Sequence, residues 1–332
     1  MSSPETADPD PKGLKRALGS KSGSKPPLIV IVGPTAVGKT EISIQLAGRL
    51  GGEIVSADSR LFYRGMDIGT AKPTPQECRG VPHHLIDVAD SGTTWSLALF
   101  QQAAAAAIAA IHVHGRLPML VGGTGQYIHA VTHGWTPPLT LPDPQLRAEL
   151  QAKAVNKGYL ALHTELKKLD PAAAEKIDPR NVRRTIRALE VISLTGKKFS
   201  GQRGKMESPY RLLTLGLTRP RPELYARVDA RIEVMFANGL LDEVQRLLDS
   251  GFSPELPTMS AIGYRECVEV LAGRMDVEQA KVEIRRLTRI FVRRQANWFK
   301  MADPSIYWFE AGQAGLVSEI EEVIRGFLKE VL

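Results

Sequence analysis

A strand-to-helix passage near the N-terminus constrains this chain more tightly than anything else in its sequence. Residues 28–40 read LIVIVGPTAVGKT, in which a run typical of a buried strand leads directly into the pattern G-x-x-x-x-G-K-T. The amphipathic stretch EISIQLAGRL follows at once and completes the strand–loop–helix context that this pattern requires. The passage predicts a P-loop on an α/β sheet.

The residue types in this loop are suited to wrapping a diphosphate. Gly33 and Gly38 permit backbone conformations that turn consecutive N–H groups into one anion-binding concavity, and the following helix adds its positive N-terminal end. Lys39 supplies a point charge for phosphate oxygens, and the Thr40 hydroxyl is placed to hold Mg²⁺. The expected diphosphate contacts are Gly33, Pro34, Thr35, Ala36, Val37, Gly38, Lys39 and Thr40. The loop does not say whose diphosphate it holds.

Short apolar runs alternate with helix-length segments along most of the chain. The expected strands are LIVIV (28–32), EIVSAD (53–58), HLIDV (84–88), PMLVGG (118–123), LLTLGL (212–217) and IYWF (306–309). Continuous apolar strands between helices predict a parallel sheet covered on both faces, which is a P-loop NTPase-like α/β fold. Ligands of such sheets bind at the carboxyl ends of the strands.

The alternation breaks after Trp135, where a proline-rich connector precedes a long helical stretch. More than sixty residues without a strand is long for a simple crossover. We therefore expect a helical insertion at 137–204 within a core of 27–136 and 205–332; a pair of ordinary surface helices is the alternative. Residues 1–26 are rich in Pro, Ser, Gly and charge, which predicts a disordered tail.

The net charge of +7 suggests a polyanionic partner. Cys78 and Cys267 lie far apart with no metal-ligand spacing, which favours unpaired thiols and a cytoplasmic location. No apolar run approaches the roughly 20 residues that a bilayer requires, so no membrane association is expected. No extended apolar stripe demands a second subunit, and we expect a monomer.

Two further motifs follow predicted strands. Asp58 comes directly after the second strand, so its carboxylate is expected beside the phosphate loop. It could ligate Mg²⁺ indirectly, act as a general base, or simply cap the next helix, and the residues alone leave these readings open. In VGGTGQY, the strand-ending glycines allow close approach of a substrate, and Thr124 and Tyr127 offer hydroxyls at the same edge.

Arginines cluster in two helical segments. In PRNVRRTIRALEV, the residues Arg180, Arg183, Arg184 and Arg187 include i,i+3 and i,i+4 neighbours. Near the C-terminus, Arg285, Arg289 and Arg293 follow at i,i+4 steps. Such bands fit a nucleic-acid backbone, although a solvated helix face is the alternative. Trp298 and Phe299 are expected mainly to pack in the core.

Seven motifs together resemble one family. GPTAVGKT, DSRLFYRGMDIGTAKP, VGGTGQY, NVRRTIRALE, GLLDEV, AIGYRE and TRIFVRRQANWF occur in the order seen in bacterial-type tRNA dimethylallyltransferases, also called tRNA isopentenyltransferases. The resemblance covers about residues 28–300. It implies transfer of the dimethylallyl group from dimethylallyl diphosphate to N6 of the adenosine that follows the tRNA anticodon, with Mg²⁺ and release of diphosphate.

The resemblance also implies roles for individual residues. Asp58 corresponds to the family's general base, and Arg231 to a diphosphate contact that joins Lys39 and Thr40 as catalytic residues. The implied tRNA contacts are Asp58, Ser59, Arg60, Leu61, Thr124, Arg147, Arg183, Arg184, Arg187, Gly263, Tyr264, Arg265, Arg293, Arg294, Gln295 and Trp298. Asn297 departs from the family's usual threonine, and Arg60 from its usual residues after the aspartate–serine pair.

Two other functions remain as alternatives. A nucleoside or small-molecule kinase would use the same loop for ATP, but it leaves the arginine bands and the insertion unexplained. An RNA-binding regulator would use the nucleotide site only as a switch. A GTPase is disfavoured because the guanine-binding motif N-K-x-D is missing from the sequence.

Overall fold

The computed structural model describes residues 25–90, 92, 95–136, 138, 140, 142–202, 204–205 and 207–330. The chain divides into two compact units: unit 1 comprises Met1–Ile128 and Pro209–Leu332, and unit 2 comprises His129–Ser208. The described elements of unit 1 are β1 (Pro27–Val32), α2 (Lys39–Leu50), β2 (Gly52–Ser56), α3 (Pro75–Cys78), β3 (His83–His84), α4 (Leu97–Val113), β4 (Leu117–Gly122), β7 (Arg211–Thr218), α10 (Arg221–Ala237), α11 (Leu240–Asp249), α12 (Tyr264–Leu271), α13 (Val277–Gln295), β8 (Ile306–Glu310) and α14 (Leu316–Lys329). Helix α5 (Gly125–Thr132) begins in unit 1 and ends in unit 2.

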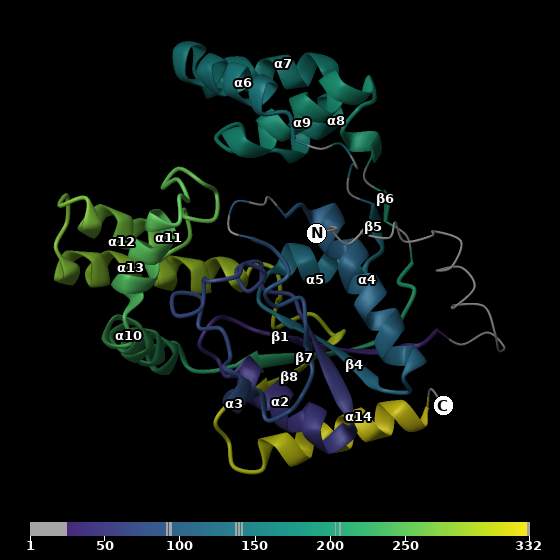
Figure 1. Cartoon of the computed structure of the whole chain (residues 1–332). Coiled ribbons are helices and arrows are strands. Elements are labelled where there is room, and N and C mark those ends of the chain that lie inside the picture. Colours follow the sequence, from purple (N-terminus) through teal and green to yellow (C-terminus); the bar gives the residue numbers. More distant parts are fainter. Residues whose placement is uncertain are drawn as a thin grey trace, which may run out of the picture. The chain divides into compact units, whose positions relative to one another are not determined.

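Unit 1 is built on a six-stranded sheet with the order β3-β2-β4-β1-β7-β8. Every neighbouring pair in it is parallel, which confirms the predicted fold class (Figure 1). Strand β1 lies between β4 and β7, and the P-loop begins where β1 ends. The carboxyl ends of β2 and β4 reach the same edge, so Asp58 and Thr124 follow strands on one side of the loop.

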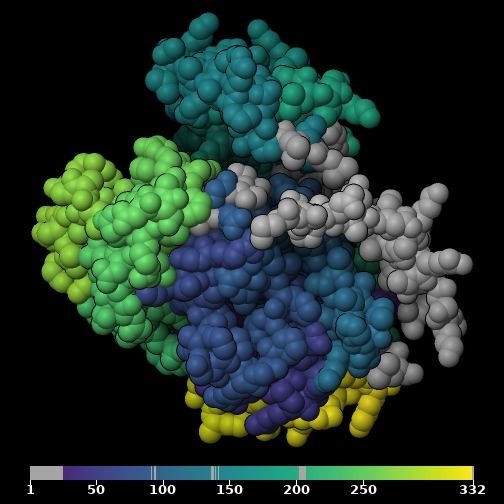
Figure 2. Space-filling view, in the orientation of Figure 1, coloured from purple at the N-terminus to yellow at the C-terminus, as the bar shows by residue number. Residues whose placement is uncertain are grey.

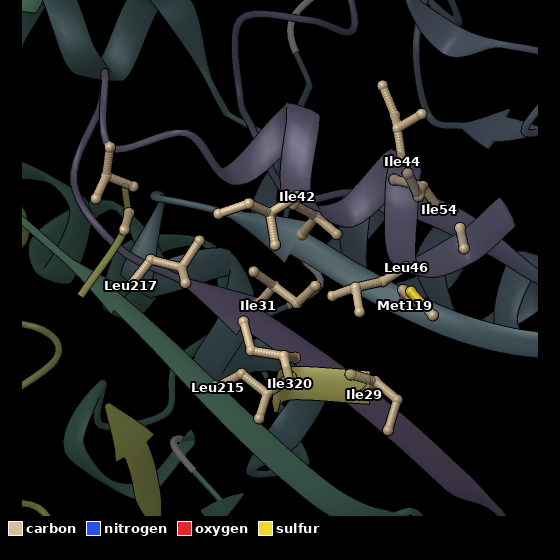
Figure 3. Close-up of a cluster of buried hydrophobic side chains, with 14 of the residues drawn as sticks. Ile29, Ile31, Ile42, Ile44, Leu46, Ile54, Met119, Leu215, Leu217 and Ile320 are labelled. Carbon is tan, nitrogen blue, oxygen red and sulfur yellow. The ribbon is translucent and has the colours of Figure 1, made fainter. Parts of the chain in front are cut away.

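The core of unit 1 explains why these strands read as continuous apolar runs. On one face, Ile29 and Ile31 of β1 pack with Ile42 and Leu46 of α2 and with Ile320 of α14 (Figure 3). Helix α4 contacts β2 and β4 and buries its own apolar side chains. Burial on both faces leaves no position in β1 for a polar residue.

One predicted strand is wrong. The run HLIDV (84–88) was expected to be extended, but the structure has a strand only at His83–His84. Leu85 has φ 63° and Asp87 has φ 55°, both in the left-handed region that an apolar or acidic residue in a strand does not adopt. The turn carries Asp87 to the side chain of Lys72, with which it forms an ion pair. A contact fifteen residues away therefore sets this backbone.

Helices α10–α13 pack on one another beside the sheet of unit 1, and helix α11 packs against the segment after β2 (Figure 2). Unit 2 contains α6 (Pro144–Lys157), α7 (Tyr159–Leu169), α8 (Pro171–Lys176) and α9 (Val182–Thr195), with a short antiparallel pair β5 (Trp135–Thr136) and β6 (Gly204–Lys205) and a 3₁₀ turn at Ser200–Gln202. Its helices share their own core around Leu162, Leu166 and Leu189. The expected insertion, 137–204, falls inside this unit.

The predicted N-terminal tail, 1–26, lies outside the described residues except for its last two positions. Among the residues that the structure describes, no helix combines the length and apolar character needed to cross a membrane.

Candidate active site

The P-loop has the backbone that its glycines predict. Gly38 has φ 112°, and Gly33 has φ 150°. A side chain at Gly33 would also collide with the chain, because its Cβ would lie 2.6 Å from the carbonyl oxygen of Leu217 in β7. Glycine at position 33 is therefore needed both for conformation and for close packing against the neighbouring strand.

Cationic side chains hold the carbonyl groups of this loop. Lys39 Nζ donates to the carbonyl oxygens of Gly33 (3.1 Å) and Pro34 (2.8 Å). From outside the loop, Arg227 Nε donates to the Ala36 carbonyl at 2.8 Å. Arg219 Nε donates to the Val37 carbonyl at 3.4 Å. These hydrogen bonds hold the carbonyl groups of the loop in place and so fix its backbone conformation. The sequence analysis did not identify Arg219 or Arg227.

The side chain of Lys39 is half-buried, and its pKa lies below the usual value of a lysine. Burial lowers the pKa of Lys39 to about 8; the charge of Asp58 opposes this shift and that of Arg231 adds to it. The three predicted groups Lys39, Asp58 and Arg231 are thus close enough to act on one another electrostatically. Burial, together with the charge of Arg227, also lowers the pKa of Arg231.

Asp58 lines two cavities. The smaller, of about 50 Å³, is shared with Lys39, Thr40 and Ser56. The larger, of about 200 Å³, is shared with Thr35, Ser59, Arg60 and Arg231 among others. Asp58 Oδ1 accepts the backbone N–H of Arg60 at 3.0 Å, and within the described residues its Oδ2 accepts no hydrogen bond. A turn and not a helix follows Asp58, so the expected helix cap is wrong; Oδ1 caps this turn instead, and Oδ2 faces no hydrogen-bond donor of the described residues.

The larger cavity has an apolar wall and a polar rim. Helices α10 and α13 contribute the apolar side chains Val228, Ile232, Ile284 and Phe291. Arg231 lies on α10 between Val228 and Ile232, and the segment Ser260–Gly263 closes part of the rim. Such a cavity can accept a molecule with an apolar end and an anionic end.

An aromatic stack stands beside Asp58. The ring of Tyr127 lies 4.3 Å from that of Phe100 and 5.8 Å from that of Phe62, nearly parallel to both, and Trp95 packs on Phe62 at 4.8 Å. Burial raises the pKa of Tyr127 to about 12, and the charges of Tyr63 and Asp58 add to this shift. Tyr127 therefore stays a neutral hydrogen-bonding group. Thr124, which is half-buried, starts helix α5 by accepting the N–H of Tyr127 and of Ile128 through its carbonyl.

A buried carboxylate that the sequence analysis did not single out organises the segment after β2. Glu243 of α11 is 2% exposed and accepts the backbone N–H groups of Asp67 (3.0 Å), Ile68 (2.7 Å) and Gly69 (3.2 Å). It also accepts the Tyr264 hydroxyl at 2.6 Å. The apolar spacing of Leu240, Val244 and Leu247 already placed position 243 on the buried face.

The side chain of Tyr264 corrects a prediction. Tyr264 was expected to contact tRNA, but it is fully buried, and a Cβ at Gly69 would lie 2.5 Å from its ring. Its neighbours in the motif differ: Gly263 lines the larger cavity and has φ 98°. Arg265 is exposed and pairs with the buried carboxylate of Glu266.

Residues at the end of α13 that were all predicted to contact tRNA differ in their exposure. Arg293 and Arg294 are exposed, whereas Gln295 is 6% exposed and bonded inward, which corrects its expected surface contact. Phe299 is buried, as predicted, but Trp298 is 40% exposed. Earlier in the helix, Arg285 and Arg289 pair with Glu233 and Asp229 of α10. Two arginines of this band, Arg285 and Arg289, therefore form ion pairs between α13 and α10.

Among the arginines of unit 2, some are likewise paired within the protein and others are not. Arg147 and Arg187 both bind Glu190, whose side chain is fully buried, through Arg147 Nε (2.8 Å) and Arg187 Nη1 (2.6 Å). Burial favours a higher pKa for Glu190, but hydrogen bonds from the two arginines hold its pKa below the usual value. Arg183 is exposed and has no hydrogen bond or ion pair to the described residues, while Arg184 is half-buried.

Comparisons with known proteins agree on one family. Residues 61–302 match the model described as IPP transferase, and residues 26–91 match the isopentenyl transferase model. The tRNA dimethylallyltransferase of Roseiflexus sp. (strain RS-1) is 51% identical over 91% of this chain and 99% of its own length. That of Thermomicrobium roseum is 48% identical over 92% of each chain.

Solved structures give the same result. The full-length tRNA isopentenylpyrophosphate transferase of Bacillus halodurans is 44% identical, with a TM-score of 0.69 over 92% of this chain and 98% of that one. A eukaryotic dimethylallyltransferase captured acting on tRNA is 28% identical, with a TM-score of 0.75 over 92% of this chain and 80% of that one.

Proposed function

The chain belongs to the IPP transferase family of tRNA dimethylallyltransferases, and we propose that its P-loop holds the diphosphate of dimethylallyl diphosphate while Asp58 accepts a proton from the tRNA adenosine. As a member of that family it is a tRNA-modifying prenyltransferase, which favours transfer over the kinase and RNA-switch alternatives. The observation that supports the proposed roles is the position of Asp58 on the walls of both cavities.

The proposed reaction follows from this arrangement. The N6 nitrogen attacks the allylic carbon of the donor, the bond from that carbon to the diphosphate oxygen breaks, and diphosphate leaves with the electron pair. The proton on N6 passes to the carboxylate of Asp58. Lys39, Arg231 and the loop N–H groups stabilise the negative charge that develops on the leaving group. The apolar wall of the larger cavity offers a surface for the dimethylallyl group.

We propose Mg²⁺ as the cofactor because the groups around the smaller cavity suit it. The hydroxyls of Thr40 and Ser56 and the carboxylate of Asp58 are hard oxygen donors. Among the described residues, no group of three or more His, Cys, Asp or Glu is gathered for a metal, so the phosphates themselves would complete the coordination. When bound, the ion neutralises charge on the leaving diphosphate.

The proposed tRNA contacts are residues that are at least partly exposed, together with Gly263, which is buried but lines the larger cavity. They are Asp58, Ser59, Arg60, Leu61, Thr124, Arg147, Arg183, Arg184, Arg187, Gly263, Arg265, Arg293, Arg294 and Trp298. The target base must leave the anticodon stack to reach Asp58, and aromatic and guanidinium faces are suited to holding its neighbours. We further propose that the enzyme acts as a cytoplasmic monomer, which sedimentation of the free protein and fractionation of the cell would test.

Labelled substrates test the proposed function directly. The protein is incubated with Mg²⁺, unmodified tRNA and either dimethylallyl diphosphate labelled in its prenyl group or ATP labelled in its γ-phosphate. The proposal requires that label enters tRNA only from the prenyl donor. Transfer of the γ-phosphate, or no transfer from either donor, would refute it.

The lowered pKa of Lys39 predicts a pH dependence for diphosphate binding. Below about pH 8 the amine is charged and attracts the anion; above it the amine is neutral. We expect the affinity of the wild type, relative to that of Lys39→Arg, to fall about tenfold between pH 7 and pH 9, since arginine stays charged throughout. Calorimetric titration with inorganic diphosphate measures both proteins, and the ratio removes the titration of the ligand. A ratio that does not change with pH would contradict the assignment.

Two arginines of α9 should respond differently to truncation. Arg183→Ala removes an exposed charge, so we expect weaker tRNA binding and a salt slope reduced by about one, with no change in melting temperature. Arg187→Ala also removes a partner of buried Glu190, so the melting temperature should fall as well. Binding titrations at several salt concentrations and thermal melts measure both effects. An unchanged salt slope in Arg183→Ala would remove that arginine from the contacts.

A further inference from the structure

The last residue of α13 reaches the phosphate loop from inside the protein. Gln295 Oε1 accepts the backbone N–H of Thr35 at 2.8 Å, and its Nε2 donates to the carbonyl oxygen of Gly123 at 3.1 Å. Thr35 belongs to the P-loop, and Gly123 directly follows β4. One buried amide therefore joins three parts of unit 1: the phosphate loop, the end of β4 and the end of α13.

The chain leaves room for this amide by carrying glycine at its partner. A Cβ at Gly123 would lie 2.3 Å from Gln295 Nε2 and 3.1 Å from the Gly33 carbonyl oxygen. Any side chain at position 123 would thus push the glutamine out and press on the first residue of the P-loop. The close approach of Gln295 explains the second glycine of the pair that ends β4. The first, Gly122, is explained by Ala57, whose carbonyl oxygen would lie 2.4 Å from a Cβ there.

The contact also demands a side chain that both accepts and donates. The Thr35 N–H needs an acceptor and the Gly123 carbonyl needs a donor, and only a terminal amide presents the two on one planar group of this length. Glutamate could serve the Thr35 N–H but would set its second oxygen against the Gly123 carbonyl. Methionine fills the same space and serves neither, which would leave two polar groups unpaired.

We propose that Gln295 is a positioning residue for the diphosphate loop and that it links this loop to the helix that carries Arg293 and Arg294. The inference rests on the proposed function, because it takes the loop as the donor site and the two arginines as tRNA contacts. Arg293 and Arg294 are exposed next to the buried Gln295. A displacement of the end of α13 on RNA binding therefore changes the hydrogen bond between the Gln295 side chain and the Thr35 N–H. Gln295 acts through the loop and touches neither substrate.

Steady-state kinetics of matched variants test the positioning role. We expect Gln295→Met to raise KM for dimethylallyl diphosphate about tenfold, the scale of a lost buried hydrogen bond, with the affinity of the donor-free enzyme for tRNA unchanged. Gln295→Glu should raise it further, because it adds a negative charge near the diphosphate. Val292→Ala is the control: Val292 is buried one turn earlier in α13, in the same apolar cluster as Val37, so its truncation lowers stability but keeps both hydrogen bonds of the Gln295 amide.

Two results of that experiment would overturn the proposal. A rise in KM for tRNA alone would make Gln295 an RNA contact. Kinetic constants that match those of Val292→Ala would leave it only a packing role. Calorimetry with inorganic diphosphate and Mg²⁺ compares the same variants by binding alone, without turnover. If the wild type transferred no prenyl group, the proposed function would be refuted, and calorimetry would still show whether Gln295 positions the loop.

The link to α13 is tested by measuring diphosphate affinity with and without a saturating anticodon stem–loop RNA. In the wild type we expect the RNA to change the affinity by about fivefold or more, the usual scale of coupling between sites. In Gln295→Met the ratio should approach one, while in Val292→Ala it should stay at the wild-type value. A wild-type ratio of one, or a ratio that survives in Gln295→Met, would refute the link.

Discussion

Asp58→Ala is expected to lower kcat for prenyl transfer by a factor of about 10²–10⁴ and to leave tRNA affinity largely intact, which is the usual scale for loss of a general base. The carboxylate lines both cavities and keeps Oδ2 without a hydrogen bond to the described residues, and in the proposed reaction it accepts the N6 proton. Single-turnover measurements with saturating donor and tRNA isolate the chemical step from binding.

The matched variants for Asp58 separate basicity from backbone capping. Asp58→Asn keeps an oxygen for the Arg60 N–H but removes the base, so it should be nearly as slow as Asp58→Ala. Asp90→Asn removes an exposed carboxylate that pairs with Arg64 and should leave the rate unchanged. A normal single-turnover rate in Asp58→Asn would mean that the residue only caps the turn.

Glu243→Ala should lower the free energy of unfolding by about 3 to 5 kcal/mol, because it strands three backbone N–H groups and one hydroxyl in the interior. Burial and the charge of Glu243 raise the pKa of Tyr264, so the phenol remains the donor of this cluster. The loss should reach the active site as well, since Gly69, Thr70 and Ala71 line the larger cavity.

Denaturant titration monitored by circular dichroism measures this loss. Asp242→Asn is the control, because Asp242 is the exposed neighbour in the same first turn of α11 and should change stability by less than about 0.5 kcal/mol. Glu243→Gln keeps one oxygen acceptor, and its free energy of unfolding should lie between those of Glu243→Ala and Asp242→Asn. If Glu243→Ala unfolds at the wild-type denaturant concentration, the carboxylate does not hold the segment after β2.

Local patterns were sufficient to predict the sheet and the P-loop. Strand β1 is buried on both faces, and this forces an apolar residue at every position, which is visible in the sequence itself. The run at 84–88 is less apolar, since it contains His84 and Asp87, and it turns at Leu85 and Asp87, where Asp87 pairs with Lys72. The alternation of residues within the run does not show that pairing.

The candidate site shows a similar division. Arg294 and Gln295 are adjacent letters of one motif, yet one is exposed and the other buried. The spacing of Ile284, Val292 and Gln295 follows the buried stripe of α13, so the helical period held the signal that the motif alone did not. Arg187 and Glu190 are i,i+3 neighbours on α9, so the helical period held this signal too. The second partner of Glu190, Arg147 of α6, had no such signal, because it comes close only when α6 and α9 pack.

The bonds from Lys39 to the carbonyls of Gly33 and Pro34 make donor binding an exchange of partners. The charged amine has three N–H donors, of which the chain holds two. An anion with several oxygens can take the third and can also replace the carbonyls, because hydrogen bonds between charged groups are the stronger ones. We therefore expect the free loop to bind diphosphate more tightly than it binds a monovalent anion.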